Sequence, residues 1–168
     1  HRFARDGARL CRVGDPVSQI YDLAVIGGGV NGAGIARDAA GRGAKVLLLA
    51  HFGRPGGQRS STLSTSMVIG DVEKVVGREI MFIPEIAGPV VDQAVSSILR
   101  AGDIALLDNT RFWPGEEKND PELAKAIAAH GTIYVNDAFS AAHRAHATTE
   151  GLAHLLPAYA GRSMEAEL

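Results

Sequence analysis

The chain has a single cysteine, little net charge and no long apolar run, and each of these absences narrows what it can be. Cys11 cannot form an internal disulfide, which fits a reducing compartment, so we expect a cytoplasmic protein. A formal net charge of −2 gives no reason to expect nucleic acid or an anionic membrane as a partner. The longest apolar runs, such as 46–50, are far too short to span a bilayer. Any anion-binding site must therefore be a local cluster on a nearly neutral surface.

The length of 168 residues and the hydrophobic content of 46% predict one globular domain, which we place at residues 21–168 and expect to be monomeric. Residues 1–20 carry four arginines but no apolar core of the signal-peptide kind. Because the sequence starts at His1 rather than at a methionine, we interpret this stretch as a flexible arm or a remnant of something longer.

From residue 21 onward, short β-rich runs alternate with amphipathic stretches. Strands are expected at 22–26, 45–50, 79–83, 103–108 and 132–136. Helices are expected at 32–42, 65–76, 88–99 and 120–129, with a last one near 149–156. The alternation, and strands that are apolar throughout, predict an α/β fold: a doubly wound, mostly parallel, Rossmann-like sheet of five or six strands in a three-layer αβα arrangement.

Local signals predict where these helices begin and end. Asp120-Pro121 supplies an N-cap and a first-turn proline for the helix at 120–129. Gly77, Gly102 and Gly131 follow three of the helices, where a left-handed C-terminal cap is expected. In the helix at 88–99, apolar spacing predicts one buried face. That face consists of Val91, Ala94, Val95 and Ile98.

Charged side chains follow several of the predicted strands. His51-Phe52-Gly53-Arg54 follows the second, Asn109-Thr110-Arg111 the fourth, and Asn136-Asp137 with His143-Arg144 the fifth. In an open α/β sheet, ligands bind beyond the carboxyl ends of the strands, so these arginines and histidines should converge at one edge. Because a planar guanidinium suits bidentate binding of phosphate or carboxylate, the set predicts a site for a small, multiply charged anion.

Other interpretations of the same residues stay open. The arginines could be scattered over the surface, as most arginines are. His143 and His146 could be helix-cap or hydrogen-bonding residues rather than ligands. No metal-ligand spacing is evident among the histidines, so we expect no metal site.

Three ordered motifs carry a family resemblance. HFGRP at 51–55, NTRF at 109–112 and AFSAAHRAH at 138–146 resemble the motifs of phosphoglycerate kinase, and residues 50–168 are similar to the N-terminal, substrate-binding half of that family. The resemblance implies that 3-phosphoglycerate is bound, with Asn136 and Asp137 in supporting roles. The substrate-binding residues that it implies are His51, Phe52, Gly53, Arg54, Arg111 and Arg144. Gly53 would let the backbone approach the ligand closely.

The first part of the domain carries a different signature. Gly27, Gly29 and Gly32 form a G-x-G-x-x-G fingerprint between the first strand and a helix, which is typical of dinucleotide binding. Residues 21–49 resemble the FAD-binding opening of FAD-dependent glycerol-3-phosphate dehydrogenase, which implies FAD as a cofactor. The fingerprint also needs an acidic residue at the end of the second strand, where this chain has Ala50.

The two resemblances meet near 42–50, and their combination limits the expected activity. The first strand of the kinase family normally ends in an aspartate–asparagine motif, where this chain has Gly27–Gly29. The kinase resemblance also implies MgATP or MgADP and a second, nucleotide-binding half with a catalytic lysine, which the sequence does not include. We therefore expect no complete catalytic site and no turnover by this chain alone. A fragment of a flavin-linked oxidoreductase and a non-catalytic anion-binding module remain as alternatives.

Overall fold

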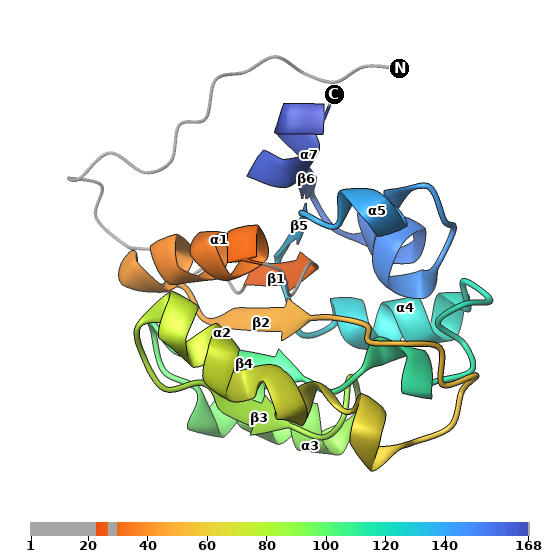
Figure 1. Ribbon diagram of the computed structural model, residues 1–168, viewed down its shortest axis with the longest axis horizontal. Coiled ribbons are helices and arrows are strands. Elements are labelled where there is room, and N and C mark those ends of the chain that lie inside the picture. Colours follow the sequence, from red (N-terminus) through yellow and green to blue (C-terminus); the bar gives the residue numbers. More distant parts are fainter. Residues whose placement is uncertain (1–22, 27–29, 168) are drawn as a thin grey trace.

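The computed structural model describes residues 23–26 and 30–167, and in this part of the chain six strands form one parallel sheet (Figure 1). The strands are β1 (Leu23–Ile26), β2 (Val46–Leu49), β3 (Met81–Ile83), β4 (Ile104–Leu107), β5 (Ile133–Asn136) and β6 (Ala158–Ala160). Their order is β3-β4-β2-β1-β5-β6, and every neighbouring pair is parallel. The predicted α/β class and the sheet of five or six strands are confirmed.

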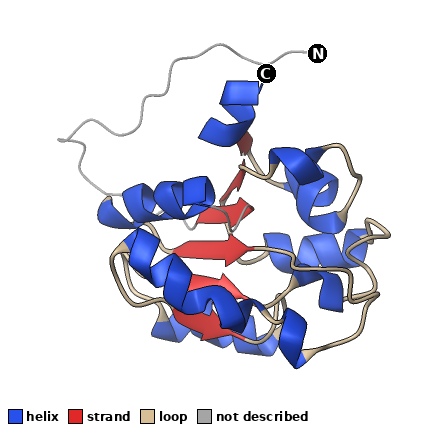
Figure 2. Cartoon of the chain, in the orientation of Figure 1, coloured by secondary structure: helices blue, strands red, loops and turns tan. Residues whose placement is uncertain are grey.

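Helices connect the strands and lie on both sides of the sheet (Figure 2). The α-helices are α1 (Val30–Gly41), α2 (Ile69–Val76), α3 (Pro89–Gln93), α4 (Pro121–Ala128), α5 (Phe139–Ala142), α6 (Leu152–Leu155) and α7 (Arg162–Glu167). Two π-helical turns adjoin these helices: η3 (Ala94–Ile98) follows α3, and η5 (Ala147–Gly151) precedes α6. Three short 3-10 turns complete the description: η1 (Ser61–Leu63), η2 (Thr65–Val68) and η4 (Thr110–Phe112).

Each face of the sheet has its own hydrophobic core, because successive strand residues point to opposite faces. Val46 and Leu48 of β2 pack with buried residues of α1 and α2. Leu47 and Leu49 pack on the other face with residues of α3, α4 and α6. All of β2 is buried, and fully burying a side chain of this size contributes about 1.5–3 kcal/mol. These two cores make the three predicted layers.

The helix predicted at 88–99 is present, but its buried face differs from the prediction. The π turn η3 ends with the Leu99 N–H donating to the Ala94 carbonyl at 2.8 Å, five residues back. This wider turn shifts the helical phase, so that Leu99 is 4% exposed while Ile98 is 48% exposed. The prediction for Ile98 was wrong because regular 3.6-residue spacing does not hold across such a turn.

The cap predictions had mixed outcomes. Gly77 ends α2 in the left-handed conformation with φ 78°, and Asp120 accepts hydrogen bonds from the Glu122 and Leu123 N–H groups at the start of α4. Gly102 has a positive φ of 90° but lies in the turn before β4, after η3 has ended at Ile98. Gly131 is not among the described glycines with positive φ, so its predicted left-handed cap was wrong.

The sequence pattern missed β6, α5 and α7. The three residues of β6 are exposed, so the strand has no apolar pattern and is held by its parallel pairing with β5. The predicted arm at 1–20 and the fingerprint residues Gly27 and Gly29 lie outside the described residues. Within the described ranges, no helix combines the length and apolar character that crossing a membrane requires.

Candidate functional site

The sheet order places a topological switch at β1. In the sheet, β2, β4 and β3 lie in that order on one side of β1, and β5 and β6 lie on the other side. The segments that follow β2, β4 and β5 therefore leave the sheet at its carboxyl edge around this switch. Ligands of open α/β sheets bind at such a crevice, and the predicted site residues lie in these three segments.

Hydrogen bonds tie the segment after β2 to the segment after β4. The Thr110 N–H donates to the Ala50 carbonyl at 3.0 Å, and the Gly57 N–H donates to the Arg111 carbonyl at 3.2 Å. The Arg111 guanidinium donates from Nη1 to the Gly53 carbonyl at 2.8 Å. Gly53 has φ 64°, and a Cβ there would meet the Leu63 side chain at 2.8 Å. Glycine is thus required at this position by the turn itself.

Arg111 is the buried cation of the site. It is 6% exposed, and its Nε meets no hydrogen-bond acceptor in suitable geometry among the described residues. The nearest carboxylate oxygen, Glu117 Oε1, lies 3.3 Å from this Nε as an ion pair without an aligned hydrogen bond. A buried guanidinium keeps its charge, so Arg111 provides a fixed positive group at the carboxyl edge of the sheet.

Neighbouring basic residues act electrostatically on His51. Its pKa is lowered to about 4, first by burial and then by the nearby charges of Arg111, His146 and Arg144. At neutral pH the ring is therefore uncharged and can donate or accept a hydrogen bond. We refer to His51, Arg111, Arg144 and His146 as the basic cluster.

The structure thus brings together three of the predicted site residues. His51, Arg111 and Arg144 belong to the basic cluster, and Gly53 contacts Arg111. Phe52 is 46% exposed, and its carbonyl accepts a hydrogen bond from the Asn109 side chain at 2.6 Å. Arg54 is exposed and makes no side-chain hydrogen bond or ion pair with the described residues. Its role at the ligand stays a prediction.

His146 joins the cluster although its role was left open by the sequence. It is 8% exposed, and its pKa is lowered by burial and then by the charge of Arg111. Its backbone N–H donates to Thr149 Oγ1 at 3.0 Å, so it also starts the turn η5. Arg144 is half-buried, with its Nε 3.3 Å from Nε2 of the exposed His143.

A buried carboxylate behind the cluster was missed at the sequence level. Glu116 is 1% exposed and accepts from the Thr148 hydroxyl at 2.5 Å and from the Thr148 N–H at 3.1 Å. Burial raises the pKa of Glu116, while the hydrogen bonds from Thr148 oppose that shift. The paired acidic residues after NTRF were the only sequence signal for it. This carboxylate fixes the segment that carries His146 and Arg144.

Asn136 and Asp137 support the fold, as the resemblance implied. Asp137 accepts from the Ser163 N–H at 2.7 Å and from its hydroxyl at 2.9 Å, which anchors α7 beyond β6. The Asn136 side chain accepts from the Ala138 N–H at 2.9 Å. Both side chains thus make local hydrogen bonds that hold the chain after β5.

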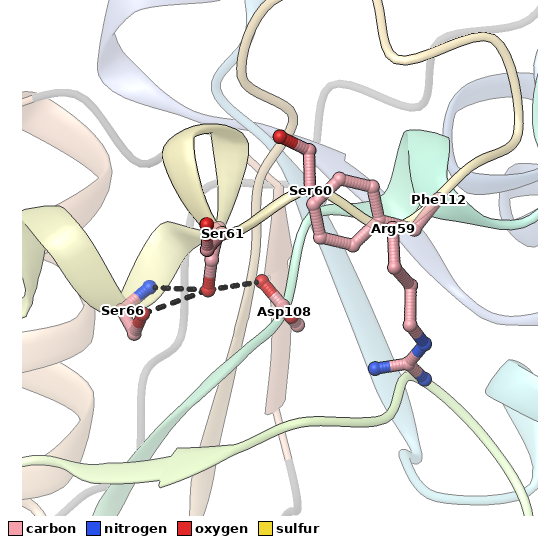
Figure 3. Close-up of a pocket in the computed structure, with 7 residues that line it drawn as sticks. Arg59, Ser60, Ser61, Ser66, Asp108 and Phe112 are labelled. Atoms are coloured by element: carbon pink, nitrogen blue, oxygen red, sulfur yellow. Dashed lines mark hydrogen bonds between the residues drawn. The ribbon is translucent and has the colours of Figure 1, made fainter.

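A separate cavity of about 320 Å³ shares no residue with the basic cluster (Figure 3). It is lined by Arg59, Ser60, Ser61, Ser64, Ser66, Asp108 and Phe112. The Ser64 hydroxyl donates to Asp108 at 2.9 Å and pairs with Ser66, as the dashed lines in Figure 3 mark. Arg59 pairs with Glu85 at 2.7 Å. Because its charged groups are already paired and Asp108 would repel an anion, we do not place the anion site here.

The described residues do not fit the cofactor that the glycine fingerprint implied. Gly32 lies buried in α1, but Ala50 follows β2, and its carbonyl accepts from Thr110. No carboxylate therefore stands where a ribose hydroxyl would be held. Within the described part of the chain, no group of three or more His, Cys, Asp or Glu residues is placed to hold a metal ion.

Comparison with known proteins gives a consistent result. The phosphoglycerate kinase family model matches residues 34–168. The chain is 60% identical to the phosphoglycerate kinase of Sphingopyxis alaskensis over 132 residues, which is 79% of this chain and 33% of that protein. It is also 60% identical to that of Rhizorhabdus wittichii over 131 residues, with 78% and 33% coverage. The chain thus spans about a third of the length of these relatives.

Solved structures show the same similarity. The phosphoglycerate kinase of Coxiella burnetii aligns with a TM-score of 0.74 and 28% identity, covering 88% of this chain and 40% of that one. The enzyme from Pyrococcus horikoshii OT3 has a TM-score of 0.74 at 22% identity, with 88% and 41% coverage, which supports the fold. The family match begins at residue 34, inside α1, whereas the motifs had placed its start at residue 50. These similarities do not support the flavin-linked alternative.

Proposed function

Because the chain belongs to the phosphoglycerate kinase family, we propose that its basic cluster binds 3-phosphoglycerate. The observation that carries this proposal is the convergence of His51, Arg111, Arg144 and His146 from three segments at the carboxyl edge of the sheet. Two guanidinium groups supply fixed positive charge, and two uncharged imidazoles supply hydrogen bonds. This combination suits a ligand with both a phosphate and a carboxylate.

Arg111 is the central residue of the proposed site. Its position is set by the Gly53 carbonyl on one side, while its Nε has no aligned acceptor among the described residues. A phosphate oxygen would complete the hydrogen bonds of this buried group and would neutralise its charge. Arg144 would contact the ligand from the opposite segment, after α5.

In the family, a phosphoryl group is exchanged between MgATP and the carboxylate of 3-phosphoglycerate. The residues of this chain would hold and orient the acceptor and partly exclude water from it. We propose that the chain alone, which spans 33% of the length of a curated relative, binds the acceptor without phosphoryl transfer. Stabilisation of a phosphoryl-transfer transition state needs charged groups around both substrates.

Isothermal titration calorimetry with 3-phosphoglycerate tests the binding proposal. We expect saturable binding by the wild-type chain and a loss of roughly tenfold or more in Arg111→Ala, because a hydrogen bond to a charged group contributes about 1.5–3 kcal/mol. Arg100→Ala is the matched control, because Arg100 is exposed and precedes β4 at the opposite edge of the sheet. Lack of saturable binding by a folded wild-type chain would refute the proposed function.

A coupled assay with 3-phosphoglycerate and MgATP tests the proposed absence of turnover. The purified chain should give the same rate as a preparation of Arg111→Ala. A rate above that of the variant, proportional to the concentration of wild-type chain, would show that the chain transfers phosphoryl groups by itself.

A further inference from the structure

A partly exposed acidic side chain, Glu117, lies beside Arg111 in the basic cluster. Glu117 Oε1 is 3.3 Å from Arg111 Nε, and the negative charge of Glu117 also raises the pKa values of His51 and His146 against the lowering effect of their burial. Its carboxylate therefore acts on three of the four members of the cluster.

The two partners of this ion pair differ in their freedom to move. The Arg111 side chain is 6% exposed and is held by the Gly53 carbonyl, whereas the Glu117 side chain is 46% exposed. Within the described part of the chain, no hydrogen bond holds the Glu117 carboxylate elsewhere. Glu117 is therefore the partner that can move when a ligand arrives, while Arg111 stays in place.

The neighbouring residue, Glu116, fixes the backbone position of Glu117 beside the cluster. Glu116 is buried, its side chain accepts from Thr148, and its carbonyl accepts from the Ala147 N–H at 2.9 Å. These contacts fix the backbone of the acidic pair between the segment of Arg111 and the segment of His146. The position of Glu117 beside Arg111 is thus built into the fold.

We infer that Glu117 is an internal counter-ion of the basic cluster, which occupies Arg111 in the free protein and competes with an arriving phosphate or carboxylate. The inference deepens the proposed function and rests on it, since both concern the same site. A ligand must replace the Glu117 ion pair to reach Arg111. A multiply charged anion gains more contacts in this exchange than a singly charged one, so Glu117 favours ligands such as 3-phosphoglycerate over small monovalent anions.

Glu117→Gln tests the inference, because it removes the charge and keeps the shape. Calorimetry with inorganic phosphate and, separately, with 3-phosphoglycerate should show roughly three- to tenfold tighter binding by the variant, as expected for removing a half-exposed competing charge. Glu79→Gln is the matched control, because Glu79 is exposed and precedes β3 at the opposite edge of the sheet. This control should bind both anions as the wild-type chain does.

A second readout needs no ligand. In an NMR titration, the pKa values of His51 and His146 should be lower in Glu117→Gln than in the wild-type chain, and unchanged in Glu79→Gln. Tighter phosphate binding by Glu117→Gln with no binding of 3-phosphoglycerate by either protein would support the counter-ion and refute the proposed function. Phosphate binding by Glu117→Gln that is no tighter than in the wild type, or unaltered histidine pKa values, would overturn the inference.

Discussion

Asn109 Nδ2 lies 2.6 Å from the carbonyl oxygen of Phe52, so the segment after β4 directly holds the segment after β2. The same amide group donates to the Leu63 carbonyl at 2.9 Å, and its Oδ1 accepts from the Arg111 N–H at 3.1 Å. Asn109 is 0% exposed. One buried side chain thus positions both the histidine loop and the arginine of the basic cluster.

Asn109→Ala should therefore destabilise the protein. Truncation removes these hydrogen bonds and leaves buried backbone groups without partners, for which we expect a loss of about 2–3 kcal/mol in the free energy of unfolding. Urea denaturation measures it. Gln58→Ala, at an exposed position of the loop after β2, should change the stability by less than about 0.5 kcal/mol. A loss in Asn109→Ala as small as that of the control would contradict the assigned role.

Stability should fall when the pH is lowered from 7 to 5, and His51 should account for part of this fall. Its pKa is about 4 in the folded protein, against 6.5 for an unperturbed histidine. In this window the unfolded chain binds a proton that the folded chain does not, so acidification favours unfolding. Because the ring is partly exposed, we expect a contribution of roughly 1 kcal/mol.

Urea denaturation of the wild-type chain and of His51→Gln at both pH values measures this contribution. The free energy of unfolding should fall less between pH 7 and pH 5 in His51→Gln than in the wild-type chain. Burial raises the pKa of Glu116, and that group has the opposite sign: its contribution to stability is present at low pH and is lost as the pH rises. This effect is common to both proteins and cancels in the difference. An NMR titration of His51 with a midpoint near 6.5 would contradict the prediction.

Thr148→Val tests the buried carboxylate behind the cluster. The variant keeps the shape of Thr148 but loses the hydroxyl that donates to Glu116 at 2.5 Å. We expect the free energy of unfolding to fall by about 1.5–3 kcal/mol, because a hydrogen bond to a charged acceptor is lost in a buried place. Thr62→Val, at an exposed position, is the control in thermal or urea denaturation. Equal stability of the two variants would show that Glu116 does not depend on Thr148.

Two glycines should respond to alanine in opposite directions. A Cβ at the buried Gly161 would collide with the side chain of Asp137, so Gly161→Ala must displace the contact that anchors α7 and should cost about 1–3 kcal/mol. A Cβ at Gly70 in α2 meets nothing within 4 Å, so Gly70→Ala should stabilise the protein by up to about 1 kcal/mol. Thermal unfolding of both variants checks the pair, and a stabilised Gly161→Ala would contradict the packing at Asp137.

The periodicity of apolar residues predicted much of the fold, and the charged residues that follow the strands predicted part of the candidate site. The run VLLL at 46–49 is apolar at every position because β2 is covered on both faces, and such a run can be recognised without coordinates. His51 and Arg111 could be assigned to one edge because parallel strands end at the same side of a sheet. The Asp120 cap depends only on contacts within three residues, and it was also predicted correctly.

Other features depend on contacts between distant residues. Ile98 faces solvent because a π turn changed the helical phase, and β6 exists through pairing with β5 although its own residues are exposed. Arg54 and Arg111 both follow predicted strands, yet only Arg111 is buried.

The sequence by itself determined the α/β class, the parallel sheet and the edge at which the charged residues gather, because these follow from short-range periodicity and chain direction. Only the tertiary structure decided which charges act on one another. The neutral state of His51, the burial of Glu116 and the pairing of Glu117 with Arg111 arise from desolvation and from distances of a few ångströms between separate segments. Such distances are set by the packing of the whole domain and are not encoded in any local pattern.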